Sequence, residues 1–416
     1  MKKFLLFISY LFLLANLTVV AQRPMVQYDM EGLEILKKNL EKKTTSKETL
    51  KEYQRLIKDA NKMLTAKNPT VINKQIATPT GSKNDYLSIS RYWWPDEKKK
   101  DGLPWIRKDG ETNPDTQTDA VDRKRLGKMS KYIETLSLAY FFSEDEKYAK
   151  KGISIINTWF IDKATKMNPH LQYAQSVPGN PKSRRSGILD GRDIPVKVLD
   201  GITLISKSKQ WKPEHTYGID KWVMEYTLWL VYSDTGLKGA KQENNHGSWY
   251  NYQVAALAYY SGYNTILKNA INRTKKLFDI QLNEEGGQEH ELKRTRSYFY
   301  SCFNLDAITR TAIVAEKAGM PFWNYSSSEN NGGISKALDF LMPAANGGEW
   351  SYKTTKKGLE LAYLAPVLKR ISGRVDNEEY EATYKVIYDK FLDKEKKTSK
   401  EKKIYRDHNF INQGLR

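Results

Sequence analysis

The stretch "SKYIETLSLAYFFSEDEKYAKKGISIINTWFI", residues 130–161, decides the fold class. Apolar side chains recur every three or four residues on both sides of a short polar break, which is the spacing of one face of an α-helix. The break, Ser143-Glu144-Asp145, can cap the second helix. The stretch therefore predicts two helices that form a hairpin.

The same periodicity extends along the chain. "MEGLEILKKNLEKK" (30–43) and "KETLKEYQRLIKDANKML" (47–64) predict two helices near the N-terminus. Further amphipathic helices are expected at 219–233, 249–261, 263–280, 302–318, 355–371 and 376–392. Alternating strands are scarce, and stacked helix hairpins give a bundle, a solenoid or a closed toroid. With no Gly/Ser-rich or Pro-rich linker, residues 22–416 are expected to form one all-α domain.

The first residues have the layout of a secretory signal. Lys2 and Lys3 precede a short apolar run and a Val-Val-Ala sequence, so cleavage is expected near Ala21. The run is short for a membrane span, so we expect no membrane anchor and an exported protein, periplasmic or extracellular. The single cysteine, Cys302, excludes an intrachain disulfide framework and a cysteine-rich metal site.

The formal net charge of +19 points to an anionic partner. For an exported protein nucleic acid is a poor candidate, and an acidic polysaccharide fits better. Part of the excess has a simpler explanation, because "KEKKTSKEKK" (394–403) is expected to be a solvated lysine face.

Two long segments, 84–116 and 167–193, resist helix assignment and are rich in aromatic residues. Long irregular loops in a helical domain are usually functional or disordered, and the aromatic density argues against disorder. Four aromatic side chains fit either the core or a platform on which sugar rings stack: Tyr92, Trp93, Trp94 and Trp105. The second alternative fits an elongated carbohydrate cleft.

Two clusters carry chemistry. "NNHGSWY" (244–250) lies between two expected helices, with Ser248 as the expected N-cap of a helix that begins at Trp249. "HELKRTRSYFYSCFNLDA" (290–307) places two arginines and two tyrosines close together. The simpler alternatives are a polar loop for the first cluster and an exposed basic turn beside core aromatics for the second.

The residue types in these clusters suit eliminative cleavage of a polyuronate. The C5 hydrogen of a uronate becomes acidic enough only when donors or cations neutralise the neighbouring carboxylate, and Asn, His and Arg supply these groups. A tyrosine can then act as base and acid, if positive charge nearby lowers its pKa. Hydrolysis would instead need a pair of carboxylates, and neither cluster offers an obvious pair.

"NNHGSWY" closely resembles the Asn-Asn-His motif of the alginate lyase superfamily, whose members fold as α/α toroids. "YLSISRYWWPD…DGLPWIRKDGETNP" resembles that family's N-terminal aromatic segment, and "NPHLQYAQSVPG…GILD" and "RTRSYFYSCFNLDA" resemble two more of its blocks. Four blocks thus match in order from about residue 84 to 310. The resemblance implies a single, incomplete (α/α)n toroid. The last hundred residues carry no motif of the family.

The resemblance also implies roles for individual residues. Asn245 and Arg294 would neutralise the substrate carboxylate, His246 would neutralise it or act as a second base, and Tyr300 would be base and acid. Tyr298 is a rival to Tyr300, because relatives often have an extra residue between the arginine and the tyrosine. A regular helix over 293–300 would pair Arg296 with Tyr300 and Arg294 with Tyr298.

Other residues in the matching blocks are expected to contact substrate, although loop-stabilising hydrogen bonds are an equal alternative for those in the second loop. This set comprises Asn244, Asn168, Tyr173, Gln175, Tyr92, Trp93, Trp94 and Trp249. No histidine spacing suggests a metal site, and no dinucleotide or phosphate-binding motif is convincing. We therefore expect no metal or cofactor.

Together these patterns predict an exported polysaccharide lyase that cleaves alginate, in particular mannuronate-rich alginate, by β-elimination. A lyase for another acidic polymer, such as glucuronan or a glycosaminoglycan, would use the same residues. A non-catalytic protein that binds acidic glycans through its aromatic loops is the alternative from a different class. The oligomeric state is left open by the sequence.

Overall fold

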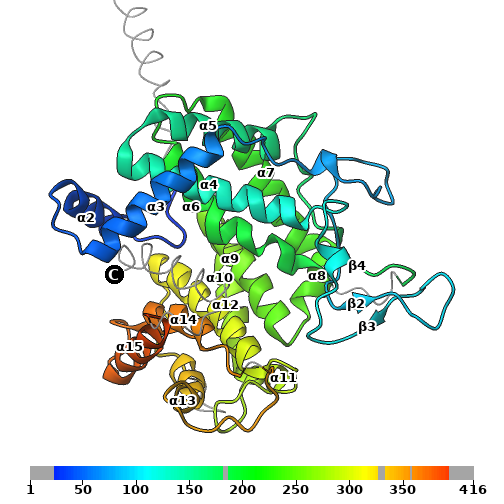
Figure 1. The fold of residues 1–416 in the computed structure, drawn as a ribbon, viewed down its shortest axis with the longest axis vertical. Coiled ribbons are helices and arrows are strands. Elements are labelled where there is room, and N and C mark those ends of the chain that lie inside the picture. The colour runs from blue at the N-terminus through cyan, green and yellow to red at the C-terminus, as the bar shows by residue number, and fades with distance from the viewer. Residues whose placement is uncertain (1–22, 181–185, 327–332, 357, 393–416) are drawn as a thin grey trace, which may run out of the picture.

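A computed structural model describes residues 23–180, 186–326, 333–356 and 358–392 (Figure 1). The structure is 60% helical with few strands, which confirms the all-α prediction. The predicted signal peptide at 1–21 and the lysine run at 394–403 lie outside the described residues. The assignment of one domain to 22–416 stays a prediction.

The hairpin predicted from residues 130–161 is present. Its first helix, α4, spans Arg123–Ser143 and its second, α5, spans Glu146–Ile156. Glu144, in the left-handed region at φ 56°, ends α4, and the Asp145 side chain caps α5 by accepting a hydrogen bond from the Lys147 amide. The predicted break and cap are confirmed.

A buried helix, α9 (Asn245–Ser261), lies at the centre of the fold. It packs against α7 (Pro213–Tyr232), α10 (Asn264–Gln281) and α12 (Ser297–Lys317), and Figure 1 shows α9, α10 and α12 as neighbours. Almost every residue of α9 is buried, as expected for a helix that is covered on all sides.

The predicted start of this helix was wrong. Asn244, not Ser248, is the N-cap, because its side chain accepts a hydrogen bond from the His246 amide at 3.0 Å. Asparagine caps helices as well as serine does, and here it lies four residues earlier. Ser248 lies inside the helix and makes a hydrogen bond with Gln281.

The other helices surround this centre. Several predicted boundaries differ: α7 begins at Pro213 rather than 219, α12 begins at Ser297 rather than 302, and only 365–371 of the predicted 355–371 is α-helix. Gly358, at φ 83°, and a 3-10 turn at Leu361–Tyr363 interrupt that region. The remaining helices are α2 (Met30–Glu41), α3 (Lys47–Leu64), α6 (Leu199–Ile205), α8 (Asp234–Ala240), α11 (Glu289–Leu292), α13 (Ile334–Ala345), α14 (Ala365–Ile371) and α15 (Glu378–Leu392).

The two long non-helical segments meet in space. Strand β1 (Leu87–Ile89), from the first segment, pairs in parallel with β4 (Tyr173–Ser176), from the second. A short antiparallel ribbon, β2 (Trp93–Trp94) with β3 (Ile106–Arg107), follows β1. The described parts of both segments thus lie on one face of the fold.

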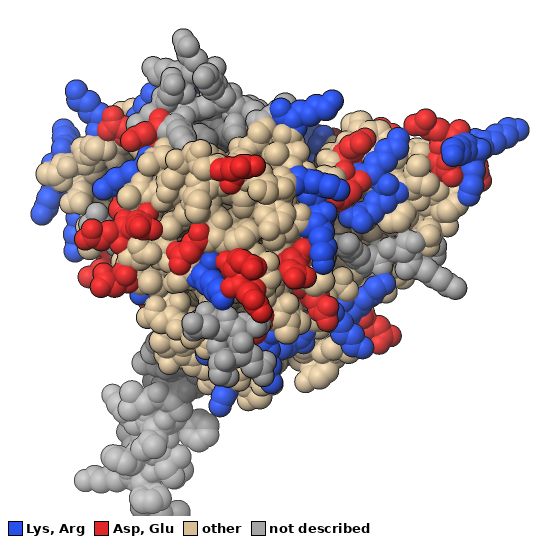
Figure 2. Space-filling view, turned by 90° about the horizontal axis from the view of Figure 1, so that it is seen from below, with Lys and Arg blue, Asp and Glu red and all other residues tan. Residues whose placement is uncertain are grey.

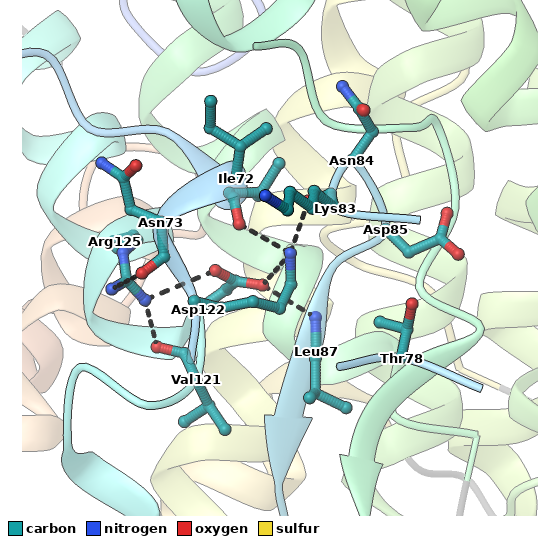
Figure 3. A network of polar contacts seen from close by, with 12 residues as sticks. Ile72, Asn73, Thr78, Lys83, Asn84, Asp85, Leu87, Val121, Asp122 and Arg125 are labelled. Carbon is teal, nitrogen blue, oxygen red and sulfur yellow. Dashed lines mark hydrogen bonds and ion pairs between the residues drawn. The ribbon is translucent and has the colours of Figure 1, made fainter. Parts of the chain in front are cut away.

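A buried network of hydrogen bonds and ion pairs joins β1 to the residues just before α4 (Figure 3). The Asp122 carboxylate accepts a hydrogen bond from the Leu87 amide at 3.0 Å, and the Lys74 ammonium lies 3.4 Å from it. Arg125 donates to the carbonyl of Val121 at 2.8 Å on the same side. Burial, which outweighs the Lys74 charge and the Leu87 amide, raises the pKa of Asp122 to about 6. The network ties β1 to the start of α4.

The molecular surface is of mixed charge. Figure 2 shows acidic and basic side chains interspersed over one face rather than a continuous basic surface. None of the helices in the described ranges is long and apolar enough to cross a membrane.

Candidate active site

A cavity of about 540 Å³ lies where the two irregular segments meet the first turns of α9 and α12. The segments contribute polar and basic residues, and α12 contributes an aromatic wall. The lining consists of Ser90, Arg91, Tyr92, Trp93, Arg107, Arg123, Gln175, Leu189, Arg192, Asn245, His246, Arg294, Phe299, Tyr300, Phe303 and Tyr363. All four residues predicted as primary catalytic groups are in this set.

The first turn of α9 brings Asn245 and His246 to the cavity. Asn245 is held by Glu291: its main-chain amide donates to Oε1 at 2.7 Å, and its Nδ2 lies 3.0 and 2.8 Å from the two carboxylate oxygens. Gly247 explains part of the motif, because a Cβ at this position would lie 1.9 Å from the Gln242 carbonyl oxygen. The turn that presents His246 therefore requires a glycine after the histidine.

Because the chain between α11 and α12 is not helical, the Arg294 guanidinium can lie over the Tyr300 ring. Since α12 begins at Ser297, residues 293–296 do not follow regular helical spacing, and the Arg294 guanidinium lies 3.7 Å from the centre of the Tyr300 ring. Arg294 is fixed from behind by an ion pair with Asp109 at 2.8 Å.

The rival pair lies elsewhere. The Tyr298 side chain is 1% exposed, donates a long hydrogen bond of 3.4 Å to the Leu341 carbonyl and packs edge-on against Trp350. Arg296 forms an ion pair with Glu360 and lies over the Phe299 ring at 3.9 Å. Neither Tyr298 nor Arg296 lines the cavity, so the pairing expected from a continuous helix was wrong.

The hydroxyl of Tyr300 lies 2.8 Å from that of Tyr92. Burial and the neighbouring Tyr92 raise the pKa of Tyr300 above its ordinary value, although the positive charge of Arg294 acts in the opposite direction. The expected lowering by cations is therefore present but is outweighed. The raised pKa keeps the Tyr300 phenol protonated at neutral pH.

Some of the other residues predicted to contact substrate line the cavity and some do not. Tyr92, Trp93 and Gln175 line the cavity. Trp94, in the same ribbon, lies outside the lining set, with the Lys108 ammonium 5.2 Å from its ring.

Four other predicted contact residues have structural partners. Asn244 caps α9, and Asn168 donates to Asp85 at 2.6 Å. Trp249 is 2% exposed and donates to the Phe303 carbonyl, and Tyr173 packs edge-on against His170. None of the four is among the lining residues.

Sequence reasoning missed the basic side of the cavity. Arg91, Arg107, Arg123 and Arg192 line it together with Arg294. Arg91 and Arg192 lie in or beside the loop stretches "RYWWPD" and "GILDGRD", so the signal was available, but an arginine in a loop is usually solvated and nothing local distinguishes these two.

A buried carboxylate, Asp190, organises this side. It accepts hydrogen bonds from Tyr86 at 2.9 Å and Ser88, from Gln175 at 3.0 Å and from Arg123 at 2.8 Å. Burial acts to raise the pKa of Asp190, but Arg123 and the hydrogen-bond donors outweigh it, and the pKa lies below its ordinary value. Asp190 thereby holds Gln175, whose backbone is in the left-handed region at φ 51°, in the lining.

Within the described parts of the chain, no three His, Cys, Asp or Glu side chains gather as a metal site would require. The chemistry available in the cavity is that of an imidazole, three phenols, two amides and five guanidinium groups.

The family and structural matches show that this helical protein is a polysaccharide lyase. The model of the alginate lyase family matches residues 70–351, and the chain belongs to that family.

Solved structures agree with this assignment. An alginate lyase from Bacteroides ovatus is 33% identical, with a TM-score of 0.84 over 95% of this chain and 100% of that one. Alginate lyase A1-III, from Sphingomonas species A1, shares the fold at 14% identity and a TM-score of 0.58. That match, over 87% of this chain and 91% of that one, is to a histidine-to-alanine variant in complex with a tetrasaccharide. Comparison with curated proteins gave no match.

Proposed function

We propose that this lyase cleaves mannuronate-rich alginate by β-elimination, with Tyr300 as base and acid and with Asn245, His246 and Arg294 neutralising the uronate carboxylate. The observation that carries the proposal is that these four residues, from two motifs about fifty positions apart, line one cavity. The similarity to solved alginate lyases supports the choice of substrate.

The first step is neutralisation of the carboxylate. The Arg294 guanidinium lines the cavity together with Asn245 and His246. Its ion-pair partner, Asp109, is not among the lining residues. Donors arranged in advance stabilise the enolate-like charge that develops when the C5 hydrogen is removed. Glu291 and Asp109 keep two of these groups in place without substrate.

The second step is proton transfer. The Tyr300 phenolate takes the hydrogen from C5, the electron pair forms the C4–C5 double bond, and the C4–O bond breaks. The leaving oxygen takes the proton from Tyr300, which restores the phenolate. Because its pKa lies above the ordinary value, the Tyr300 phenol must first lose its proton, and the Tyr92 hydroxyl at 2.8 Å can pass that proton to solvent.

The stereochemistry of the substrate decides which base acts. In mannuronate the C5 hydrogen and the leaving oxygen lie on the same side, so that one tyrosine serves both. In guluronate the hydrogen lies on the opposite face, and His246 would be the base. We propose that the reaction needs only these side chains, and that the protein acts outside the cytoplasm after cleavage near Ala21.

The test is an absorbance assay for the unsaturated uronate on polymannuronate, polyguluronate, glucuronan and a glycosaminoglycan. We expect product from polymannuronate, none with Tyr300→Phe, and near-normal product with Tyr298→Phe. Faster cleavage of glucuronan or the glycosaminoglycan would replace alginate as substrate. Binding of all polymers with no new double bond would instead indicate a glycan-binding protein.

A further inference from the structure

Four uncharged polar side chains are buried where α9, α10 and α12 meet the start of α11. Ser248, Gln281, Gln288 and Asn304 are each at most 2% exposed, and none of them lines the cavity. Buried polar groups cost stability unless they are hydrogen-bonded, and these four are joined in one hydrogen-bonded network. Whatever the network contributes to the reaction, it does not act by touching the substrate.

Asn304 is the junction of this network. Its Nδ2 donates to Gln281 Oε1 at 2.8 Å and to Gln288 Oε1 at 2.9 Å, so that both amide hydrogens are used. Asn304 lies in α12 four residues after Tyr300, which is about one helical turn. One side chain beside the turn that carries Tyr300 therefore binds two segments from elsewhere in the fold.

The branch through Gln281 leads to the Asn-Asn-His turn. Gln281 is the last residue of α10, and its Nε2 donates to the Glu243 carbonyl at 3.0 Å and to Ser248 Oγ at 3.1 Å. Glu243 and Ser248 flank the first turn of α9, which presents Asn245 and His246 to the cavity. This branch fixes that turn at both ends.

The branch through Gln288 leads to the segment that carries Arg294. The Gln288 carbonyl accepts hydrogen bonds from the amides of Glu291 and Leu292 at 2.8 and 2.9 Å and so begins α11. Its side-chain Nε2 donates to the carbonyl of Ser301, the residue after Tyr300, at 3.2 Å. The start of α11 is therefore tied to the first turns of α12.

We propose that Asn304 is a positioning residue of the reaction, whose amide sets the Asn-Asn-His turn against the segment that carries Arg294 and Tyr300. The inference rests on the proposed function, because that proposal gives these groups their roles. Two motifs about fifty positions apart must meet with their side chains in register, and a displacement of about 1 Å costs about 100-fold in rate. Asn304 is the side chain in which the hydrogen bonds from both motifs meet.

The first test is Asn304→Leu, which keeps the approximate shape of the side chain and removes both donors. On polymannuronate, well below the melting temperature, we expect kcat to fall about 10- to 100-fold while KM changes less than about threefold. The acidic limb of the kcat/KM profile should move to higher pH. The positive charge of Arg294 lowers the pKa of Tyr300, and a displaced Arg294 would lower it less.

The matched control is Thr311→Val. Thr311 is fully buried in the same helix, but its hydroxyl donates to the Ala307 carbonyl at 2.8 Å and so stays within α12. Its loss should lower the melting temperature without changing kcat, KM or the pH profile.

The double variant Gln281→Met/Asn304→Leu separates positioning from stability. Replacing both partners of a buried hydrogen bond by apolar groups costs much less stability than leaving one partner unsatisfied. The melting temperature should therefore recover relative to Asn304→Leu, while kcat stays low because the link to α9 is still missing. Gln281→Met alone should lower kcat by itself, and the two losses should be less than additive.

The outcomes distinguish this inference from the proposed function. Wild-type kcat and pH profile in Asn304→Leu, or a kcat that recovers together with the melting temperature in the double variant, would refute the positioning role and leave the proposed function intact. If Asn304→Leu does not fold, Gln281→Met decides in the same way: a normal kcat refutes the role. If the wild-type protein forms no unsaturated product from any polyuronate, both proposals fail.

Discussion

Glu291 holds Asn245 through its main-chain amide at 2.7 Å and its side-chain Nδ2 at 3.0 and 2.8 Å. The two residues come from different helices, α11 and α9, and both are 1% exposed. Glu291 thus joins the Asn-Asn-His turn to the segment that carries Arg294, three residues later in the chain.

This contact predicts that Glu291 is a positioning residue. Glu291→Gln would place an amide donor against the Asn245 amide, and a small displacement of a catalytic group costs up to about 100-fold in rate. We expect kcat to fall roughly 10- to 100-fold with a smaller change in KM, measured as product absorbance against substrate concentration. Glu289→Gln, in the same short helix but exposed, is the control and should behave as wild type. Normal kcat in Glu291→Gln would show that the contact is dispensable.

The two tyrosines of α12 should differ sharply on substitution. Tyr300→Phe removes the proposed base and acid, and we expect a loss of activity of at least about 1,000-fold, in line with loss of a group that transfers the proton twice. Tyr298→Phe removes one long, buried hydrogen bond and should cost about 0.5–1.5 kcal/mol of stability with little change in rate. Activity assays and thermal unfolding of both variants check this, and the reverse pattern would move the role to Tyr298.

Gly247 should be intolerant of a side chain. A Cβ would lie 1.9 Å from the Gln242 carbonyl and 2.9 Å from Leu277, so Gly247→Ala must shift the turn that carries His246. Overpacking of this kind costs about 1–3 kcal/mol, and activity should fall with it. The control is Gly127→Ala in α4, where a Cβ meets nothing within 4 Å and a gain of about 0.5–1 kcal/mol is expected. Equal melting temperatures and rates for the two variants would contradict the argument.

The buried carboxyl of Asp122 predicts a pH-dependent stability. Its pKa is raised to about 6, so between its unfolded value near 4 and pH 6 the folded state holds a proton that the unfolded chain releases. The stabilisation is fully present below pH 4 and is lost as the pH rises through 6. A shift of this size corresponds to roughly 1–3 kcal/mol.

Comparison with Asp122→Asn isolates this contribution, because the amide does not titrate. Chemical unfolding at several pH values from 5 to 7.5 should show the free energy of unfolding of the wild type decreasing relative to that of the variant. Parallel curves for the two proteins would show that Asp122 ionises normally.

Much of the fold follows from local pattern. The helical spacing around Ser143-Glu144-Asp145 predicted α4, α5 and the cap at Asp145, because amphipathic periodicity and capping are properties of neighbouring residues. The predicted start of α9 was wrong because Ser248, rather than Asn244, was chosen as the N-cap. The helix predicted at 355–371 failed because a glycine and a 3-10 turn interrupt its first half.

In the candidate site, too, some residues could be predicted from local motifs and others could not. Motif resemblance selected Asn245, His246, Arg294 and Tyr300, and all four line one cavity. The choice between Tyr300 and Tyr298 depended on where α12 begins, which the residue spacing left open. Trp249 and Asn168 belonged to the right blocks but have structural partners.

The sequence by itself determined the all-helical class, the clusters that carry chemistry and the residue types suited to elimination, since each is written in residues close together in the chain. Only the tertiary structure decided which arginines line the cavity, because Arg91, Arg123 and Arg192 come together where β1 pairs with β4 and Arg123 binds Asp190. Whether a guanidinium is exposed to solvent, ion-paired or buried without an ion-pair partner depends on neighbours distant in sequence, and no local sequence pattern predicts these neighbours.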